Sequence, residues 1–206
     1  IFIQGSPILK IKKGIKIGRL SGIVAHHVPF YLKSSRMPSW EVNCIDEWEE
    51  KINAIVEETI NQNMTLISGI PPWVQMYFEK IIEKKGKKIG DVFKNFSLFI
   101  YGGVSFKPYK KIFDELIGRK VNSIEVYPAS EGFFAYQDQL DSDSMLLLLN
   151  NNIYYEFIKT KDFLTGKNNY IALSDVKVGE NYAVIISTSS GLWRYNIGDT
   201  IQFTEL

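Results

Sequence analysis

Short apolar segments that alternate with helix-like stretches are the feature that most constrains the fold of this chain. The sequence predicts strands over residues 64–68, 97–101 and 122–127. The first is followed by Pro71 and a helix that ends at Gly86, and the second by a helix from Pro108 that Gly118 caps. This β-α-β-α-β order predicts a parallel sheet with right-handed crossovers and covering helices, an α/β fold.

The residues before this repeat give a mixed pattern. Apolar residues recur at helical spacing between Asp46 and Gln62, with charges on the other face, so we expect an amphipathic helix that Asp46 caps. Alternation over residues 9–12 predicts a strand. Residues 21–40 show no clear period, and we expect mostly loop there.

The chain becomes β-rich after Gly132. Short apolar runs alternate with turn-rich tracts such as Asp141-Ser142-Asp143-Ser144. The predicted strands cover residues 133–136, 145–149, 153–158, 182–187 and 201–203. We expect this half to be antiparallel or barrel-like.

We therefore interpret the chain as three parts of one larger domain. These are an irregular or β part, an α/β sheet part and a β-rich part, over residues 1–45, 46–132 and 133–206. The first residue is Ile1 rather than methionine, and the last strand-like stretch stops without a turn or tail. We expect a piece of a longer protein, because both ends look cut.

The composition of the chain argues against nucleic-acid and membrane partners. Twenty-four basic and 23 acidic residues leave a formal charge of +1, which is not the strong positive charge that neutralises phosphates in nucleic-acid binders. No run approaches the roughly 20 apolar residues of a membrane helix, so we expect no membrane partner. The single cysteine, Cys44, predicts a buried small side chain and a reducing, cytoplasmic location. The oligomeric state stays open.

The adjacent histidines His26 and His27 invite comparison with a metal site. Neighbouring residues on an extended chain point to opposite faces, and no Asp, Glu or Cys cluster accompanies this pair. We reject zinc and leave open that one histidine borders a substrate.

Ligands in open α/β sheets bind beyond the carboxyl ends of the parallel strands. Three loops are expected to meet at that edge, over residues 68–71, 102–105 and 127–132. Glycines permit close approach of a flat ligand, the ring of Tyr127 offers a stacking surface, and Glu131 can hold Mg²⁺ on a triphosphate. Farther along, Asp199 follows Gly198 at an expected strand end, and its two oxygens suit both hydroxyls of a ribose.

Each of these features also has a simpler interpretation. A glycine pair after a strand is a common entry into a helix, and a Ser-Glu pair is a common helix cap. A Gly-Asp pair is a common β-turn.

Two motifs in order give the chain a family resemblance. They are Tyr127-Pro128-Ala129-Ser130-Glu131-Gly132 and, farther on, Arg194-Tyr195-Asn196-Ile197-Gly198-Asp199. Together they resemble nucleotide motifs of the Gretchen Hagen type acyl acid amido synthetases, an auxin-responsive family within the adenylate-forming ligases. Residues 18–40, 67–80 and 99–103 also read like bacterial members of that family.

The resemblance implies roles for named residues. Gly102, Gly103 and Val104 would border the adenine of ATP, and Tyr127 would lie at its face. Ser130 would lie near the phosphates, Glu131 would organise Mg²⁺, Asp199 would bind the ribose, and Arg194 would help to place a phosphate or the neighbouring loop. The resemblance implies a ligase that activates a small carboxylic acid as acyl-AMP and transfers it to an amino acid. An apolar acid pocket is expected near the adenine, with candidates Trp73, Met76, Tyr101 and Val104, all of which can equally be core residues.

Family members also carry a phosphate loop and a C-terminal domain with a catalytic lysine, and neither is recognisable in this sequence. The resemblance thus implies that residues 1–206 are a fragment of the large N-terminal, nucleotide-binding domain of such an enzyme. We therefore expect this piece to be inactive alone. Three alternatives stay open: an acyl-CoA ligase of the same superfamily, a non-catalytic nucleotide-binding or interaction module, and a generic α/β domain whose loops match by chance.

Overall fold

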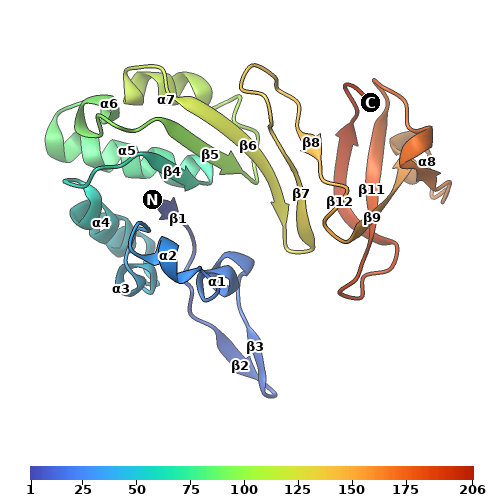
Figure 1. The fold of residues 1–206 in the computed structure, drawn as a ribbon, viewed down its shortest axis with the longest axis horizontal. Coiled ribbons are helices and arrows are strands. Elements are labelled where there is room, and N and C mark those ends of the chain that lie inside the picture. The colour runs from blue at the N-terminus through green and yellow to red at the C-terminus, as the bar shows by residue number, and fades with distance from the viewer. The chain divides into compact units, whose positions relative to one another are not determined.

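The computed structural model describes residues 1–206 and every side chain except that of Phe2. The chain divides into two compact units, Ile1–Tyr127 and Pro128–Leu206, and the ribbon of each can be followed in Figure 1. No helix among the described residues has the length and apolar character needed to cross a membrane.

The first unit is built on parallel strands. Strand β4 (Leu66–Gly69) lies between β1 (Phe2–Ile3) and β5 (Leu98–Gly102), and β5 pairs in parallel with β6 (Asn122–Ala129). Each connection from β4 to β6 carries helices, so the predicted β-α-β-α-β order and the α/β fold class are confirmed. Strand β1 was not predicted.

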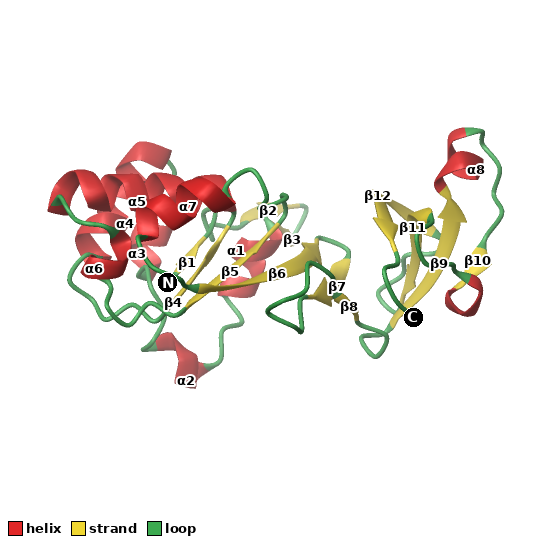
Figure 2. Cartoon of the chain, turned by 90° about the horizontal axis from the view of Figure 1, so that it is seen from above, coloured by secondary structure: helices red, strands yellow, loops and turns green.

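Helices α4 (Trp48–Thr59), α5 (Pro71–Lys85) and α7 (Lys110–Ile117) form one layer against these strands. Helix α5 contacts both α4 and α7, and Figures 1 and 2 show α5 and α7 side by side. A short helix α6 (Ile89–Val92) lies between α5 and β5. The layer is amphipathic as expected, but Glu47 rather than Asp46 caps α4, because its carboxylate accepts hydrogen bonds from the backbone N–H groups of Glu49 and Glu50.

An aromatic core joins this helical layer to the sheet. Fully buried side chains come from helices, strand β5 and the segment between them; they include Tyr77, Phe78, Phe93, Phe96, Phe99 and Phe113. The Tyr77 hydroxyl is satisfied by the Thr59 hydroxyl at 2.7 Å, and burial raises the pKa of Tyr77. This core stabilises the first unit, because it removes large apolar side chains of several elements from water.

Helix α5 ends where the sequence predicts. Its C-cap Gly86 has a φ of 64°, in the left-handed region that favours glycine, and a Cβ added there would meet no atom within 4 Å. Substitution Gly86→Ala is therefore expected to cost about 1 kcal/mol through backbone strain alone. Gly86→Asn should cost less, because asparagine tolerates this conformation better. Urea unfolding measures the free energy of unfolding of both variants. Equal stability of Gly86→Ala and the unsubstituted protein would contradict the prediction.

The first 45 residues differ from expectation. Residues 10–17 form a hairpin of β2 (Lys10–Lys12) and β3 (Ile15–Ile17), so the strand predicted there is confirmed. The expected loop over 21–40 is wrong, because helices α1 (Leu20–Ala25) and α2 (Phe30–Lys33) lie within it and α3 (Trp40–Asn43) begins at its end. Helices this short complete too few turns for an apolar period to show.

The second unit is antiparallel. Strands run in the order β10 (Ile171–Ala172), β9 (Ile153–Lys159), β11 (Asn181–Thr188) and β12 (Tyr195–Gln202), so the antiparallel alternative is the one observed. Strands β7 (Gly132–Tyr136) and β8 (Leu146–Leu147) form a further antiparallel pair. Helix α8 (Thr160–Leu164) and a 3₁₀ turn at Leu173–Asp175 were not predicted. The unit has its own buried core of β9 and β11 side chains, including Phe157, Tyr182 and Ile186.

Candidate functional site

The predicted adenine loop lies at the carboxyl end of the parallel sheet. In the register, Ser68 of β4 pairs with Ile100 and Gly102 of β5 pairs with Val126 of β6. Gly103 and Tyr127 therefore each follow a paired residue at the same edge. The sheet brings together the glycine pair and the tyrosine that the sequence singled out.

One residue of the glycine pair has a left-handed backbone. Gly103 has a φ of 82°, and a Cβ added there would meet no atom within 4 Å. Glycine is thus required by conformation and not by crowding at this residue. The backbone here is exposed, as is the following Val104.

The segment expected as a loop over 127–132 is mostly strand. Strand β6 continues through Pro128 to Ala129, and only Ser130 and Glu131 form the turn before β7. Ser130 is exposed and Glu131 is half-buried. The two predicted phosphate and metal residues thus occupy a tight turn rather than a broad loop, which fixes their backbone on both sides.

Asp199 lies within a strand and not at a strand end, which corrects the expected turn at Gly198-Asp199. In the β11–β12 register, Ala183 pairs with Thr200 but Ile185 pairs with Asn196, so residues 197–199 form a bulge. Gly198 has a φ of 87° and donates its backbone N–H to Asn196 Oδ1 at 3.0 Å. Bulges change the direction of side chains next to functional sites, and Asp199 lies within this one.

Arg194 is held by a partner that the sequence did not indicate. Its Nε and Nη2 atoms donate to Glu156 of β9 at 3.0 and 2.9 Å, and the guanidinium lies 4.2 Å from the ring centre of Tyr170. The hydrogen bonds to Glu156 raise the pKa of Arg194. Its backbone has a φ of 44°, and its N–H donates to the Ser187 hydroxyl at 3.0 Å. The only local signal for Glu156 is a charge inside the apolar run Tyr154-Tyr155-Glu156-Phe157-Ile158.

Removing Arg194 should lower the stability of the fold more when Glu156 is present than when Glu156 is replaced. Arg194→Met is expected to lower the unfolding temperature by several degrees, because it leaves the 9% exposed Glu156 carboxylate without its bidentate partner. The same change in a Glu156→Gln background should have a smaller effect, since no buried charge remains. Calorimetry of the two single variants and the double variant measures this coupling. Additive effects would show that the pair contributes nothing to stability.

The predicted acid-pocket residues differ in burial. Tyr101 is 8% exposed and packs in the aromatic core, with ring centres 5.4 Å from Phe99 and 4.5 Å from Phe106. Trp73 and Met76 are half-buried on α5, and Trp73 packs on Trp48 at 4.9 Å. In this structure Tyr101 is a core residue, and the other two keep partly accessible side chains.

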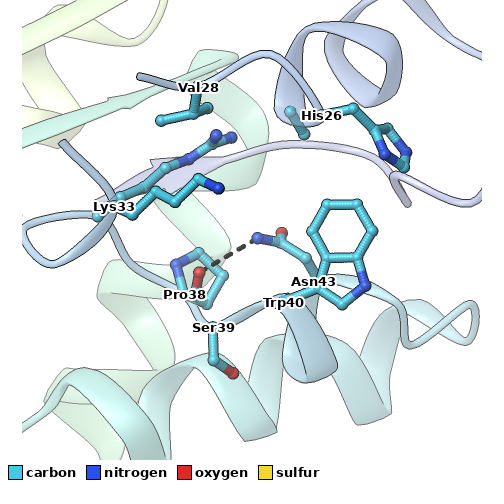
Figure 3. A pocket seen from close by; sticks show the side chains of 9 residues that line it. His26, Val28, Lys33, Pro38, Ser39, Trp40 and Asn43 are labelled. Atoms are coloured by element: carbon cyan, nitrogen blue, oxygen red, sulfur yellow. Dashed lines mark hydrogen bonds between the residues drawn. The ribbon is translucent and has the colours of Figure 1, made fainter. Parts of the chain in front are cut away.

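A separate cleft lies among the short N-terminal helices. It has a volume of about 410 Å³ and is lined by residues of α1, α2 and α3 and the segments between them, including His26, Lys33, Arg36, Trp40 and Asn43 (Figure 3). His26 Nε2 lies 3.0 Å from the Pro7 carbonyl oxygen, and its ring meets Trp40 edge to face at 4.7 Å. The sequence analysis left open that one histidine borders a substrate, and His26 lines this cleft, but no pattern indicated its other walls.

Metal-ligand types do not cluster in the part of the chain that the structure describes. No group of three or more His, Cys, Asp or Glu side chains is placed to hold a metal ion among those residues. Cys44 is half-buried, which corrects the expectation of full burial, and this burial raises the pKa of its thiol. Any magnesium ion here would have to share its coordination with oxygens of a bound phosphate group.

Family comparison covers most of the chain. A model of the GH3 family N-terminal domain matches residues 6–121, and a model of the GH3 family central domain matches residues 146–206.

Two plant enzymes are among the curated relatives. An indole-3-acetic acid-amido synthetase of Arabidopsis thaliana is 33% identical over 82 residues, 38% of this chain and 14% of the relative. A jasmonoyl-L-amino acid synthetase of Nicotiana attenuata is 32% identical over 122 residues, 55% of this chain and 21% of the relative. The matched part of the chain thus spans about a fifth or less of the length of these relatives.

Solved structures show the same fold. The acyl acid amido synthetase GH3.15 superposes with a TM-score of 0.73 over 98% of this chain and 44% of that protein, at 10% identity. A 2-hydroxyisobutyryl-CoA ligase, solved with an acyl-AMP and CoA, gives a TM-score of 0.54 over 73% of this chain and 31% of that protein, at 14% identity. At these identities the likeness concerns the fold alone.

Proposed function

This chain belongs to the GH3 family, and we propose that it is part of an enzyme that activates a carboxylic acid with ATP and transfers it to an amino acid. The observation that carries the proposal is the register of β5 and β6. Because Gly102 pairs with Val126, the glycine pair and Tyr127 share the carboxyl edge of the sheet, where open α/β folds bind ligands. The amido synthetases among the relatives support the reaction class.

The chemistry follows from the inertness of a carboxylate toward amines. Its negative charge and poor leaving group both oppose addition, so the acid must first be activated. A carboxylate oxygen attacks the α-phosphorus of ATP, the bond to pyrophosphate breaks, and an acyl-AMP mixed anhydride forms. The neutral amine of the amino acid then attacks the acyl carbon, the bond from that carbon to AMP breaks, the nitrogen loses a proton to solvent, and the product is an amide.

The residues of this chain would bind and orient the nucleotide. In this proposal Gly102, Gly103 and Val104 border the adenine, and the ring of Tyr127 lies at its face. Asp199 accepts hydrogen bonds from the ribose hydroxyls. Such positioning supplies much of the rate in phosphate chemistry because the reacting atoms are held in line.

The phosphate end of the nucleotide would meet Ser130, Glu131 and Arg194. Glu131 would hold Mg²⁺ together with phosphate oxygens, and the ion would neutralise charge on the departing pyrophosphate. Its half-buried carboxylate on a tight turn fits a metal that takes few protein ligands. Arg194 is already oriented by Glu156 and offers Nη1, which takes no part in that pair, to an anion.

Carboxylate-dependent exchange of pyrophosphate into ATP tests this proposal. The full-length protein is expected to incorporate labelled pyrophosphate into ATP only when a suitable acid is present. A panel of aryl, indolyl and aliphatic acids covers the range of chemistry. Absence of exchange across the whole panel would favour a non-catalytic nucleotide-binding module instead.

An acyl-CoA ligase is a second candidate, because a 2-hydroxyisobutyryl-CoA ligase solved with an acyl-AMP shares the fold, although a shared fold does not select the acceptor. The adenylation step would be identical, and only the acceptor would change from an amine to a thiol. Mass spectrometry of products formed with amino acids or with coenzyme A decides between the two. A cytoplasmic location, expected from the single cysteine, belongs to the same proposal.

A further inference from the structure

Glu156 is a buried carboxylate on the interior strand β9 of the second unit. Its neighbours along the strand, Tyr155, Phe157 and Ile158, are buried aromatic or apolar residues. A carboxylate in such a position has to be paired, because an unpaired buried charge is costly. Its partner is Arg194, whose side chain is 58% exposed. The ion pair therefore joins a buried anion to a largely exposed cation.

The register of the sheet places Glu156 on the same face as part of the predicted nucleotide motif over residues 194–199. Glu156 pairs with Ile185 of β11, and Ile185 pairs with Asn196 of β12. Strands β9, β11 and β12 can be followed side by side in Figures 1 and 2. Residues directly opposite each other on neighbouring strands lie on the same face of a sheet. Glu156 and Asn196 thus share one face.

Several contacts hold Arg194 in one orientation. Its Nε and Nη2 atoms donate to the two carboxylate oxygens of Glu156 at 3.0 and 2.9 Å, and the ring of Tyr170 lies 4.2 Å from the guanidinium carbon. Its backbone has a left-handed φ of 44°, and its N–H donates to the Ser187 hydroxyl at 3.0 Å. A two-point hydrogen bond of this kind fixes the plane of the guanidinium, which an unpaired arginine would not keep.

This arrangement leaves one edge of the guanidinium for a ligand. Nη1 makes no hydrogen bond to the residues that the structure describes, whereas Nε and Nη2 are both used by Glu156. A buried ion pair gives little net stability compared with apolar residues of the same volume, so stability alone does not explain this one. An oriented arginine on a strained backbone is typical of a group that is prepared to bind an anion.

We propose that Glu156 is a positioning residue, which holds the guanidinium of Arg194 so that Nη1 donates to the α-phosphate of ATP while the acyl-AMP forms. The inference rests on the proposed function, because it specifies how Arg194 acts within that reaction. As the bond from the carboxylate oxygen to the α-phosphorus forms and the bond to pyrophosphate breaks, a donor that is already in place stabilises the charge on the phosphate oxygens. Glu156 itself touches neither ATP nor the acid. Its loss should therefore lower kcat and leave the affinity for ATP nearly unchanged.

Pyrophosphate exchange and calorimetric titration with ATP measure these two effects in the full-length protein. Glu156→Gln keeps the size of the side chain but replaces one accepting oxygen by an NH₂ group. Its kcat is expected to fall about tenfold or more, because misplacing a group by about 1 Å can cost up to about 100-fold in rate. Its Kd for ATP should stay within about twofold of that of the unsubstituted protein.

Two further variants support this test. Glu156→Asp keeps the charge but draws the carboxylate back by one methylene, so its kcat should fall as well, and it replaces Glu156→Gln where that variant fails to fold. Glu180→Gln is the matched control, because it removes a carboxylate that is paired with Lys159 at 2.6 Å in the same unit, and it should change neither kcat nor Kd. A kcat within about twofold of the unsubstituted protein in a folded Glu156 variant would overturn the proposal.

Chemical rescue gives a readout that a purely structural role of Glu156 would not change. Arg194→Gly removes the side chain, glycine tolerates the left-handed backbone there, and kcat should fall about 100-fold or more. Added guanidinium should restore kcat about tenfold in Arg194→Gly, where Glu156 can hold it, and not at all in the double variant with Glu156→Gln. Methylammonium lacks the planar fork and should restore neither variant. Equal restoration of both variants by guanidinium, or restoration of neither, would overturn the proposal.

The same assays keep this proposal apart from the proposed function. Exchange by the unsubstituted protein that does not respond to Glu156→Gln overturns the positioning role and leaves the adenylation reaction intact. Absence of exchange by the unsubstituted protein across the whole panel of acids overturns the proposed function and, with it, this role.

Discussion

Replacing Asp199 by alanine in the full-length protein is expected to raise the KM for ATP about 100-fold, because two hydrogen bonds to a charged acceptor are lost and each is worth about 1.5 kcal/mol or more. Asp199 lies within the β12 bulge, where the backbone N–H of Gly198 donates to Asn196 Oδ1. Its oxygens would accept from both ribose hydroxyls. The KM for ATP should rise, and the KM for the acid should stay unchanged.

Steady-state pyrophosphate exchange at varied ATP measures this effect. Asp199→Asn keeps one acceptor oxygen and should lie between alanine and the unsubstituted protein. Asp175→Ala removes an exposed carboxylate from the same unit and serves as the control. An unchanged KM for ATP in Asp199→Ala would remove the ribose assignment.

The largest effect on stability is expected from Phe78→Ala. Phe78 is 0% exposed, and its ring centre lies 5.4 Å from that of Phe113 and 6.1 Å from that of Phe96. Removing the ring loses its burial and leaves a cavity among rigid aromatic neighbours, which together cost about 3–5 kcal/mol. The midpoint of urea unfolding of the first unit should fall accordingly.

The matched control is Phe30→Ala on α2. Its ring is 85% exposed, so its loss should change stability by no more than about 0.5 kcal/mol. Similar midpoints for the two variants would mean that the aromatic cluster around Phe78 does not stabilise the first unit.

The parallel part of the fold could be predicted because each of its strands and helices is indicated by neighbouring residues in the sequence. Strands β4, β5 and β6 are apolar runs bounded by glycine or proline, and the helices between them end at Gly86 and Gly118, which both adopt left-handed backbones. A period of 3.6 residues over α5 is long enough to be recognised. Such segments specify their structure without help from distant residues.

The errors occurred where structure depends on distant partners. Strand β12 begins at Tyr195 rather than at Ile201 because a bulge absorbs Gly198 and Asp199, which read locally as a turn. The partnership of Glu156 with Arg194 joins two strands far apart in sequence. No short stretch of the sequence contains both Glu156 and Arg194, so local patterns could not predict their ion pair.

The candidate site was readable only in part. The end predicted for the strand over residues 97–101 locates the glycine pair, and the register places Gly102 beside Val126, one residue before Tyr127. The sequence did not show that β6 continues past Tyr127 to Ala129. The roles of Glu131 and Asp199 come from family resemblance and stay predictions. The cleft at Asn43 could not be predicted beyond the open possibility of a histidine at a substrate, because it is assembled from short helices that leave no period in the sequence.

A crystal structure of the full-length protein with AMP and Mg²⁺ tests the central claim most directly. The claim predicts one adenosine with its adenine against Gly103 and Tyr127, its ribose at the Asp199 carboxylate and its phosphate on the side of Glu131. Glu131 and Asp199 on separate surfaces, with AMP contacting neither or only one of them, would contradict it.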